Sequence, residues 1–122
     1  MDSNKKIAQL LEQDANKSRV GILMAVHRRK DINHLERRQQ QRAISNAMIK
    51  VALMYGEKSF SRGAMVFTLN DRSLEKSPYA KFVDVLRGLR VVCLAGPPNP
   101  KILTAYWHHQ TKRRVSKSRS YN

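Results

Sequence analysis

The chain has 122 residues, of which 41% are hydrophobic, and its 24 Lys and Arg side chains against 9 Asp and Glu give a formal net charge of +15. This length predicts one domain, and the apolar share is too high for a wholly disordered polypeptide. The longest apolar run, Val20 to Val26, is far shorter than the roughly 20 residues that cross a bilayer, and no signal peptide pattern precedes it, so a membrane protein and a secreted one are both unexpected.

The N-terminal segment combines one clear helix pattern with an ambiguous stretch. Apolar residues at helical spacing predict a short amphipathic helix over residues 4–16. The apolar segment 20–26 fits either a helix packed on the domain or a segment that meets a partner. We expect residues 1–30 to form an N-terminal helical extension.

Two helices are predicted next. Asp31 or Asn33 can cap a helix that runs to Arg42, and Ser45 can cap a second one. Gly56 stands where a left-handed residue commonly ends a helix. The apolar stripe of the second helix is expected to face the core and comprises Ile44, Met48, Ile49, Ala52 and Leu53.

The second half of the chain predicts strands around one further helix. The apolar run 64–69 is typical of a strand and ends in turn-forming residues. Ser77 followed by Pro78 predicts the start of a helix of about ten residues. Segments 90–95 and 101–107 predict two strands joined by a proline-rich loop. Helices followed by a small antiparallel sheet indicate an α+β fold.

One basic face of the first predicted core helix could carry chemistry. His34, Arg38 and Arg42 are spaced four residues apart and therefore project along one side of a helix. A neutral imidazole can accept the proton of a ribose 2′-hydroxyl while guanidinium groups neutralise the phosphate oxygens. These are the groups that a metal-independent ribonuclease needs. The alternative is a solvated helix face, because Glu36 and Arg37 are interleaved with these residues.

The same segment resembles a known sequence pattern. From His34 to Ser45 it is similar to the motif H-x-x-x-R-x-x-x-R-G-I-S of an uncharacterised family, placed by fold in the barnase, EndoU, colicin and RelE group of ribonuclease toxins. Ala43 stands where this family has Gly. The helix ending in Gly56, the next strand and the final paired strands follow in the family's order, so the resemblance covers residues 31–107.

The resemblance implies a RelE/barnase-like domain in which a helix pair packs on a twisted antiparallel sheet. It implies that His34 acts as general base or acid and that Arg38 and Arg42 clamp phosphate in a cleft beside the last strand. Thr104 and Tyr106 share one face of that strand, so their hydroxyls could bind phosphate, although a half-buried structural role for Tyr106 is equally open. An acidic antitoxin or immunity protein is the partner that the resemblance implies.

The positive charge predicts RNA, or another nucleic acid, as the partner, because regularly spaced phosphates bind basic surfaces with release of counterions. Residues 108–122 are expected to form a basic tail. Two other readings stay open: a non-catalytic nucleic-acid-binding module, and a basic protein that docks to an acidic partner. The side chains expected to contact phosphates without reading bases are Arg37, Arg62, Arg72, Lys101, Lys112, Arg113 and Arg114.

No cofactor and no metal ion is expected. The histidines and the single cysteine do not form a zinc-ligand pattern, and the chain has neither a glycine-rich phosphate loop nor a nucleophile elbow. Cys93 lies in an apolar run and is expected to be a small buried hydrophobic residue. A lone thiol suits a reducing compartment, which predicts a cytoplasmic location.

Overall fold

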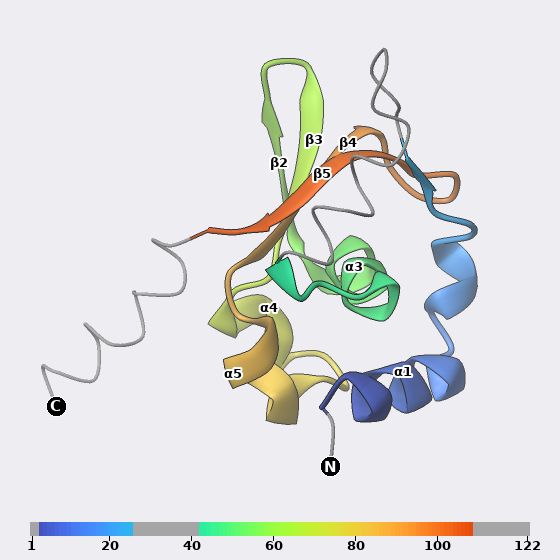
Figure 1. Cartoon of the computed structure of the whole chain (residues 1–122), viewed down its shortest axis with the longest axis vertical. Helices are drawn as coiled ribbons and strands as arrows, with labels where there is room; N and C mark the ends of the chain where they lie inside the picture. The colour runs from blue at the N-terminus through green and yellow to red at the C-terminus, as the bar shows by residue number, and fades with distance from the viewer. Residues whose placement is uncertain (1–2, 26–41, 109–122) are drawn as a thin grey trace, which may run out of the picture.

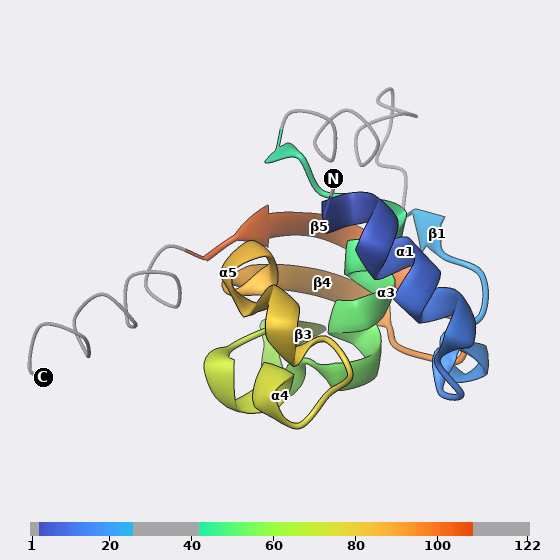
Figure 2. The same cartoon turned by 90° about the horizontal axis from the view of Figure 1, so that it is seen from below.

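A computed structural model describes residues 3–25 and 42–108 of the chain. Helices lie on one side of a five-stranded sheet (Figure 1, Figure 2). In spatial order its strands are β1 (Met24–Ala25), β5 (Lys101–Trp107), β4 (Leu89–Ala95), β3 (Ala64–Thr68) and β2 (Glu57–Ser61). The strands pair antiparallel except for β1, which pairs in parallel with β5. The predicted α+β class is therefore confirmed.

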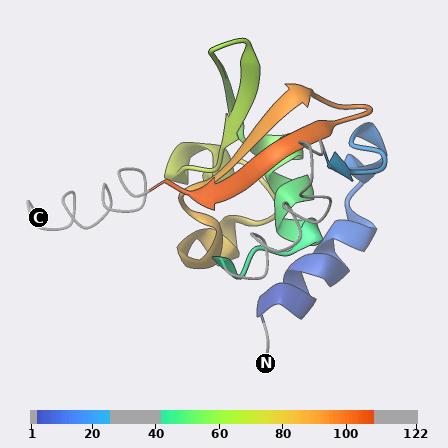
Figure 3. The same ribbon diagram turned by 45° about the horizontal axis from the view of Figure 1, so that its top comes forward.

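The N-terminal segment shares its core with the rest of the described chain. The predicted first helix is present as α1 (Ser3–Gln13), and its Ile7 is fully buried against the central helix α3 (Asn46–Tyr55). A short 3-10 helix, η1 (Lys17–Arg19), follows. The apolar segment after it does not form a second helix in its described part but enters the sheet as β1 (Met24–Ala25), beside the start of β5 (Figure 3).

Asp14 links α1 to two other parts of the fold. Its carboxylate accepts hydrogen bonds from the Tyr55 hydroxyl at 2.8 and 3.0 Å, from the Tyr79 hydroxyl at 3.0 Å and from the Asn16 backbone N–H at 2.9 Å. Tyr79 is fully buried, and its ring centroid lies 5.7 Å from that of Tyr55. Hydrogen bonds to an ionised acceptor are stronger than neutral ones, so this network holds the end of α1 in place.

Helix α3 (Asn46–Tyr55) is the centre of the core. Ser45 caps it as predicted, since its hydroxyl accepts a hydrogen bond from the Met48 backbone N–H at 3.1 Å. The helix has its own capping signal and a broad apolar surface, which explains why its sequence pattern was sufficient to predict it. The predicted stripe of Ile44, Met48, Ile49, Ala52 and Leu53 is buried throughout.

Gly56 ends α3, but the predicted left-handed conformation is wrong. The residue is extended, with φ −65° and ψ 150°. A Cβ atom at this position would lie 2.5 Å from the Ala52 carbonyl oxygen and 3.2 Å from the Thr68 backbone nitrogen. Glycine is therefore needed here because backbone approaches it closely, and not because of its φ angle.

A hairpin follows α3 and projects away from the helices (Figure 1). Its second strand, β3 (Ala64–Thr68), confirms the predicted strand, whereas β2 (Glu57–Ser61) was not predicted as a strand. All residues of β2 are exposed, and Phe60 is its one large apolar side chain, so it lacks the alternation that marks a strand. Arg62 and Gly63 join the two strands with φ angles of 51° and 80°, as in a type I′ turn.

A short helix replaces the turn that was expected after β3. Asn70 caps α4 (Asp71–Glu75), because its side-chain oxygen accepts a hydrogen bond from the Ser73 backbone N–H at 2.8 Å. The Ser73 hydroxyl and the Asn70 backbone N–H form the reciprocal bond at 3.0 Å. This capping box begins a helix too short to show a periodic apolar pattern.

The helix of about ten residues predicted after Ser77 is wrong in length. The segment instead contains a 3-10 helix, η2 (Ala80–Phe82), and a single helical turn, α5 (Val83–Leu86). The Ser77 hydroxyl accepts a hydrogen bond from the Tyr79 backbone N–H, which forms a tight turn before the buried Tyr79. Gly88, with φ +91°, then turns the chain into the next strand.

The last two strands confirm the predicted hairpin. They are β4 (Leu89–Ala95) and β5 (Lys101–Trp107), joined by a loop with a cis peptide bond between Pro97 and Pro98. Cys93 is fully buried on the helix side of β4, as expected, and burial raises the pKa of its thiol to about 11.

Candidate functional site

The predicted catalytic residues fall into two groups. Arg42, Thr104 and Tyr106 are described and lie on or beside β5. His34 and Arg38 lie outside the described residues. The same holds for part of the predicted RNA contacts, namely Arg37, Lys112, Arg113 and Arg114.

Arg42 is fixed against the C-terminal half of β5. Its Nη1–H donates a hydrogen bond to the Ala105 carbonyl oxygen at 2.7 Å. In return, the Trp107 indole Nε1–H donates to the Arg42 backbone carbonyl oxygen at 2.8 Å. These two bonds span more than sixty positions of sequence and hold a part-buried guanidinium group at the last strand. Arg42 is therefore fixed beside β5.

Ala43 determines the direction in which the chain leaves Arg42. It has φ 55°, in the left-handed region that L-residues other than glycine rarely adopt. Arg42 is helical and Ala43 is a turn residue, so the left-handed residue lies where it can end a helix. The position at which this chain departs from the family motif is thus one where the backbone favours glycine.

Thr104 and Tyr106 lie on the face of the sheet opposite the helices. Ala105, between them, is fully buried in the core, and side chains alternate along a strand. Thr104 is paired with Val92 and Tyr106 with Arg90, so these four side chains share that face. Both hydroxyl-bearing side chains are half-buried.

Thr68 and Arg90 extend this face across the sheet. Thr68 pairs with Arg90 and Arg90 with Tyr106, which forms a row over β3, β4 and β5. The Arg90 Nε–H donates a hydrogen bond to the Thr68 hydroxyl at 3.0 Å. Neither residue was selected from the sequence, although a charged residue at the edge of an otherwise apolar strand is a usable signal.

We refer to Arg42, Arg90, Thr104 and Tyr106 together as the β5 cluster: the last three share one face of the sheet, and Arg42 is held at β5 through Ala105 and Trp107, which alternate to the other face. Guanidinium forks and hydroxyl groups are donors that match phosphate oxygens in charge and geometry. None of the four side chains is a carboxylate, so the cluster favours an anion. It contains no imidazole, and His34, which was predicted for proton transfer, lies outside the described residues.

The other described basic residues predicted to contact RNA are spread over the molecule. Arg62 is at the tip of the β2–β3 hairpin, and Lys101 begins β5. Arg72 lies on α4, which follows the opposite end of β3. All three are exposed, but the strand registers place Arg62 and Lys101 away from the Tyr106 end of the sheet.

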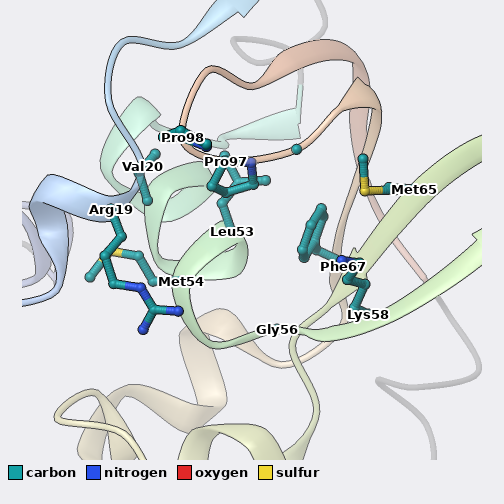
Figure 4. Close-up of a pocket in the computed structure, with 11 residues that line it drawn as sticks. Arg19, Val20, Leu53, Met54, Gly56, Lys58, Met65, Phe67, Pro97 and Pro98 are labelled. Carbon is teal, nitrogen blue, oxygen red and sulfur yellow. The ribbon is translucent and has the colours of Figure 1, made fainter.

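A hollow of about 600 Å³ lies elsewhere, between α3, the hairpin and the loop at 96–98 (Figure 4). None of the predicted site residues lines it. Within residues 3–25 and 42–108, no group of three or more His, Cys, Asp and Glu side chains could hold a metal ion. No helix in these ranges is long and apolar enough to span a membrane.

Comparison with known proteins identifies no relative of this chain. No protein-family model, no curated protein and no solved structure matches the chain. The assignment of a function therefore depends on the residues and geometry described above.

Proposed function

We propose that this protein binds RNA and cleaves it as a metal-independent endoribonuclease of toxin type. The observation that carries the proposal is the Arg42 guanidinium, whose Nη1–H lies 2.7 Å from the Ala105 carbonyl oxygen on β5, the strand that also carries Thr104 and Tyr106. A net charge of +15 on 122 residues supports a polyanionic substrate. The left-handed Ala43, at the glycine position of the family motif, supports the resemblance from which the catalytic roles come.

In the proposed reaction His34 accepts the proton of a ribose 2′-hydroxyl, and the 2′-oxygen forms a bond to phosphorus. The bond from phosphorus to the 5′-oxygen breaks, and an acid protonates the leaving oxygen. Arg38 and Arg42 neutralise the charge that builds on the non-bridging oxygens, while Thr104 and Tyr106 donate hydrogen bonds to them. The products are a 2′,3′-cyclic phosphate and a 5′-hydroxyl end.

The test is incubation of the full chain with a labelled single-stranded RNA in excess chelator, followed by a denaturing gel and detection of the cyclic phosphate. We expect cleavage by the unmodified protein, its loss in His34→Ala, and a rate lower by roughly 10²-fold in Arg42→Lys, which keeps the charge but not the planar fork. Tyr106→Phe tests the Tyr106 hydroxyl alone. Lys76→Ala is the control variant, because it changes an exposed residue on another part of the surface.

Thermal unfolding of each variant separates a lost reaction from a lost fold, because Arg42 also holds the Ala105 carbonyl. RNA that stays intact at every protein concentration would contradict the ribonuclease proposal. If that RNA still shows a salt-sensitive shift on a native gel, the second candidate function, a non-catalytic nucleic-acid-binding module, is favoured. The wide spread of the exposed Arg62, Arg72 and Lys101 supports that alternative.

The proposal includes a cytoplasmic location and an acidic antitoxin or immunity protein as partner. The first is supported by Cys93, which is the only cysteine and is buried as a free thiol. The second is supported by the excess of basic residues, which an acidic protein would neutralise.

A further inference from the structure

The hollow in Figure 4 has an apolar floor. Leu53 and Met54 come from the end of α3, Met65 and Phe67 from β3, and Pro97 from the loop between β4 and β5. Its volume of about 600 Å³ is enough for a large side chain together with the backbone that carries it. The two methionine thioethers can adapt to different apolar shapes.

Two cations stand on opposite sides of this floor (Figure 4). Arg19 reaches the hollow from η1, and Lys58 reaches it from β2. Both residues are exposed, and the described lining contains no carboxylate. The rim of the hollow is therefore complementary to negative charge.

The apolar surface continues from the hollow along the hairpin. Lys58 pairs with Phe67 and Phe60 pairs with Met65, so all four side chains lie on the same face of the two strands. Phe60 is 73% exposed, and the Lys58 Nζ lies 5.6 Å from its ring centroid. In the described chain β2 is the last strand of the sheet, so its outer backbone edge is available to an added strand.

We propose that the hollow and the adjoining hairpin face with the exposed Phe60 bind an extended acidic segment of a partner protein. One large apolar side chain of that segment would sit against Leu53 and Phe67, and flanking carboxylates would pair with Arg19 and Lys58. The exposed edge of β2 would supply main-chain hydrogen bonds, as in other cases of strand addition. This inference does not depend on ribonuclease activity, because the β5 cluster contributes no residue to the hollow.

An apolar side chain fits this site better than a nucleobase does. Apart from Arg19 and Lys58, the side chains that line the hollow are apolar. The polar edges of a base would find side-chain partners there only in Arg19 and Lys58 and would otherwise lose water without compensation, which costs free energy. A Leu or Phe side chain has no such groups to satisfy.

Gly96 offers a way to fill the hollow with only a small shift of a neighbouring side chain. A Cβ atom at Gly96 would lie 3.2 Å from the Met65 Sδ and 3.4 Å from the Phe67 Cζ, so a side chain there points toward the floor. The nearest atoms belong to flexible Met65, which can move aside. The variant Gly96→Leu therefore tests occupancy, and the double variant Arg19→Glu with Lys58→Glu tests charge.

The experiment selects from a displayed library of random dodecapeptides against the full chain and then measures the affinity of the enriched peptides by fluorescence anisotropy. We expect enriched peptides to combine Asp or Glu with a large apolar residue. Gly96→Leu and the Arg19/Lys58 double variant should each weaken binding by about tenfold or more, whereas Lys5→Glu with Lys76→Glu, which changes the net charge equally, should have little effect.

Methionine methyl signals in NMR spectra locate the bound peptide. Those of Met54 and Met65 should shift on binding, and that of the core residue Met48 should stay in place. Failure to enrich acidic peptides, or equal affinity for a folded Gly96→Leu variant, would overturn the proposal. So would a single-stranded RNA that shifts the same methyl groups and loses affinity in Gly96→Leu, since the hollow would then be a nucleic-acid site.

Discussion

Ala43 is held in a backbone conformation that glycine adopts more readily. Its φ of 55° brings its Cβ close to backbone atoms, which costs an L-residue roughly 1–2 kcal/mol. The conformation persists because Arg42, immediately before it, is bound to β5 at both its side chain and its carbonyl group. The two bonds of Arg42 to β5 therefore hold a strained backbone conformation next to the candidate site.

We expect Ala43→Gly to raise the free energy of unfolding by about 0.5–1 kcal/mol, because relief of strain exceeds the added entropy of the unfolded chain. Urea denaturation followed by circular dichroism measures the change. Ala47→Gly, the same substitution inside α3, should instead lower stability by roughly 0.5–1 kcal/mol. Equal losses in both variants would show that the left-handed position carries no strain.

Tyr55 and Tyr79 share the Asp14 carboxylate, and both hydroxyl groups are sensitive to pH. Burial raises the pKa of each phenol above its ordinary value of about 10, and the neighbouring Asp14 raises it further. At Tyr55 the hydrogen bond from Asn16 acts in the opposite direction. The neutral phenols are thus favoured by folding, since the unfolded chain releases these protons at lower pH.

A group whose pKa is raised in the folded state stabilises the fold below its unfolded pKa and loses this contribution as pH rises. We therefore expect the free energy of unfolding to begin falling near pH 10, at the unfolded pKa of tyrosine, and to keep falling above it. Tyr79→Phe should be less stable at neutral pH by about 1 kcal/mol and should show a shallower fall above pH 10. Parallel pH profiles for the two proteins would contradict a role for Tyr79, since lysine titration is common to both.

The candidate site could be predicted only in part from the sequence. The four-residue spacing that ends at Arg42 indicates a helix face, but it carries no information about the Ala105 carbonyl, which is distant in sequence. The two-residue alternation of side chains along a strand correctly predicted that Thr104 and Tyr106 share one face. Arg90 was missed because its partners, Thr68 and Tyr106, belong to other strands, and register is set by the whole sheet.

At the scale of elements, segments with a strong local signal were found. The capped α3 and the apolar β3, β4 and β5 agree with their predicted positions. Elements whose stability depends on neighbours were missed: β2 is exposed on both faces, and α4 is a single capped turn. Strand β2 is held by its pairing with β3 and α4 by its cap, so neither needs the periodic apolar pattern by which an element is predicted from a sequence.

The junction of α3 and β2 depends on a glycine for steric reasons. A Cβ at Gly56 would meet backbone atoms on two sides, Ala52 O at 2.5 Å and Thr68 N at 3.2 Å. Backbone cannot move aside as a flexible side chain can, so we expect Gly56→Ala to lower the free energy of unfolding by about 1–3 kcal/mol. Chemical denaturation measures this loss, and Gly96→Ala, whose nearest contact is the flexible Met65, is the matched control. A Gly56→Ala variant as stable as the control would refute the close approach.

At the scale of the whole molecule, the N-terminal segment and the sheet stabilise each other. Ile7 of α1 and Val20 are 0% and 1% exposed, and both belong to the cluster that includes α3 and the strands. Asp14 adds a polar link between the same parts. The hairpin, by contrast, projects away from this core and carries Arg62 at its tip (Figure 1).

The charge of the whole molecule gives a final prediction, which holds whether or not RNA is cleaved. Because each phosphate contact releases counterions, the logarithm of the RNA affinity should fall linearly with the logarithm of salt concentration, by roughly 0.7 per contact for a single strand. Arg62→Asn keeps a residue that tolerates the left-handed turn, so it removes one charge without opening the hairpin. If Arg62 contacts a phosphate, the slope measured by anisotropy at several salt concentrations should become shallower by roughly 0.7 in this variant.

Lys5→Gln, on the exposed face of α1, removes the same charge and should leave the slope nearly unchanged. Equal effects of the two substitutions would mean that the net charge acts as a diffuse field and that Arg62 makes no specific contact.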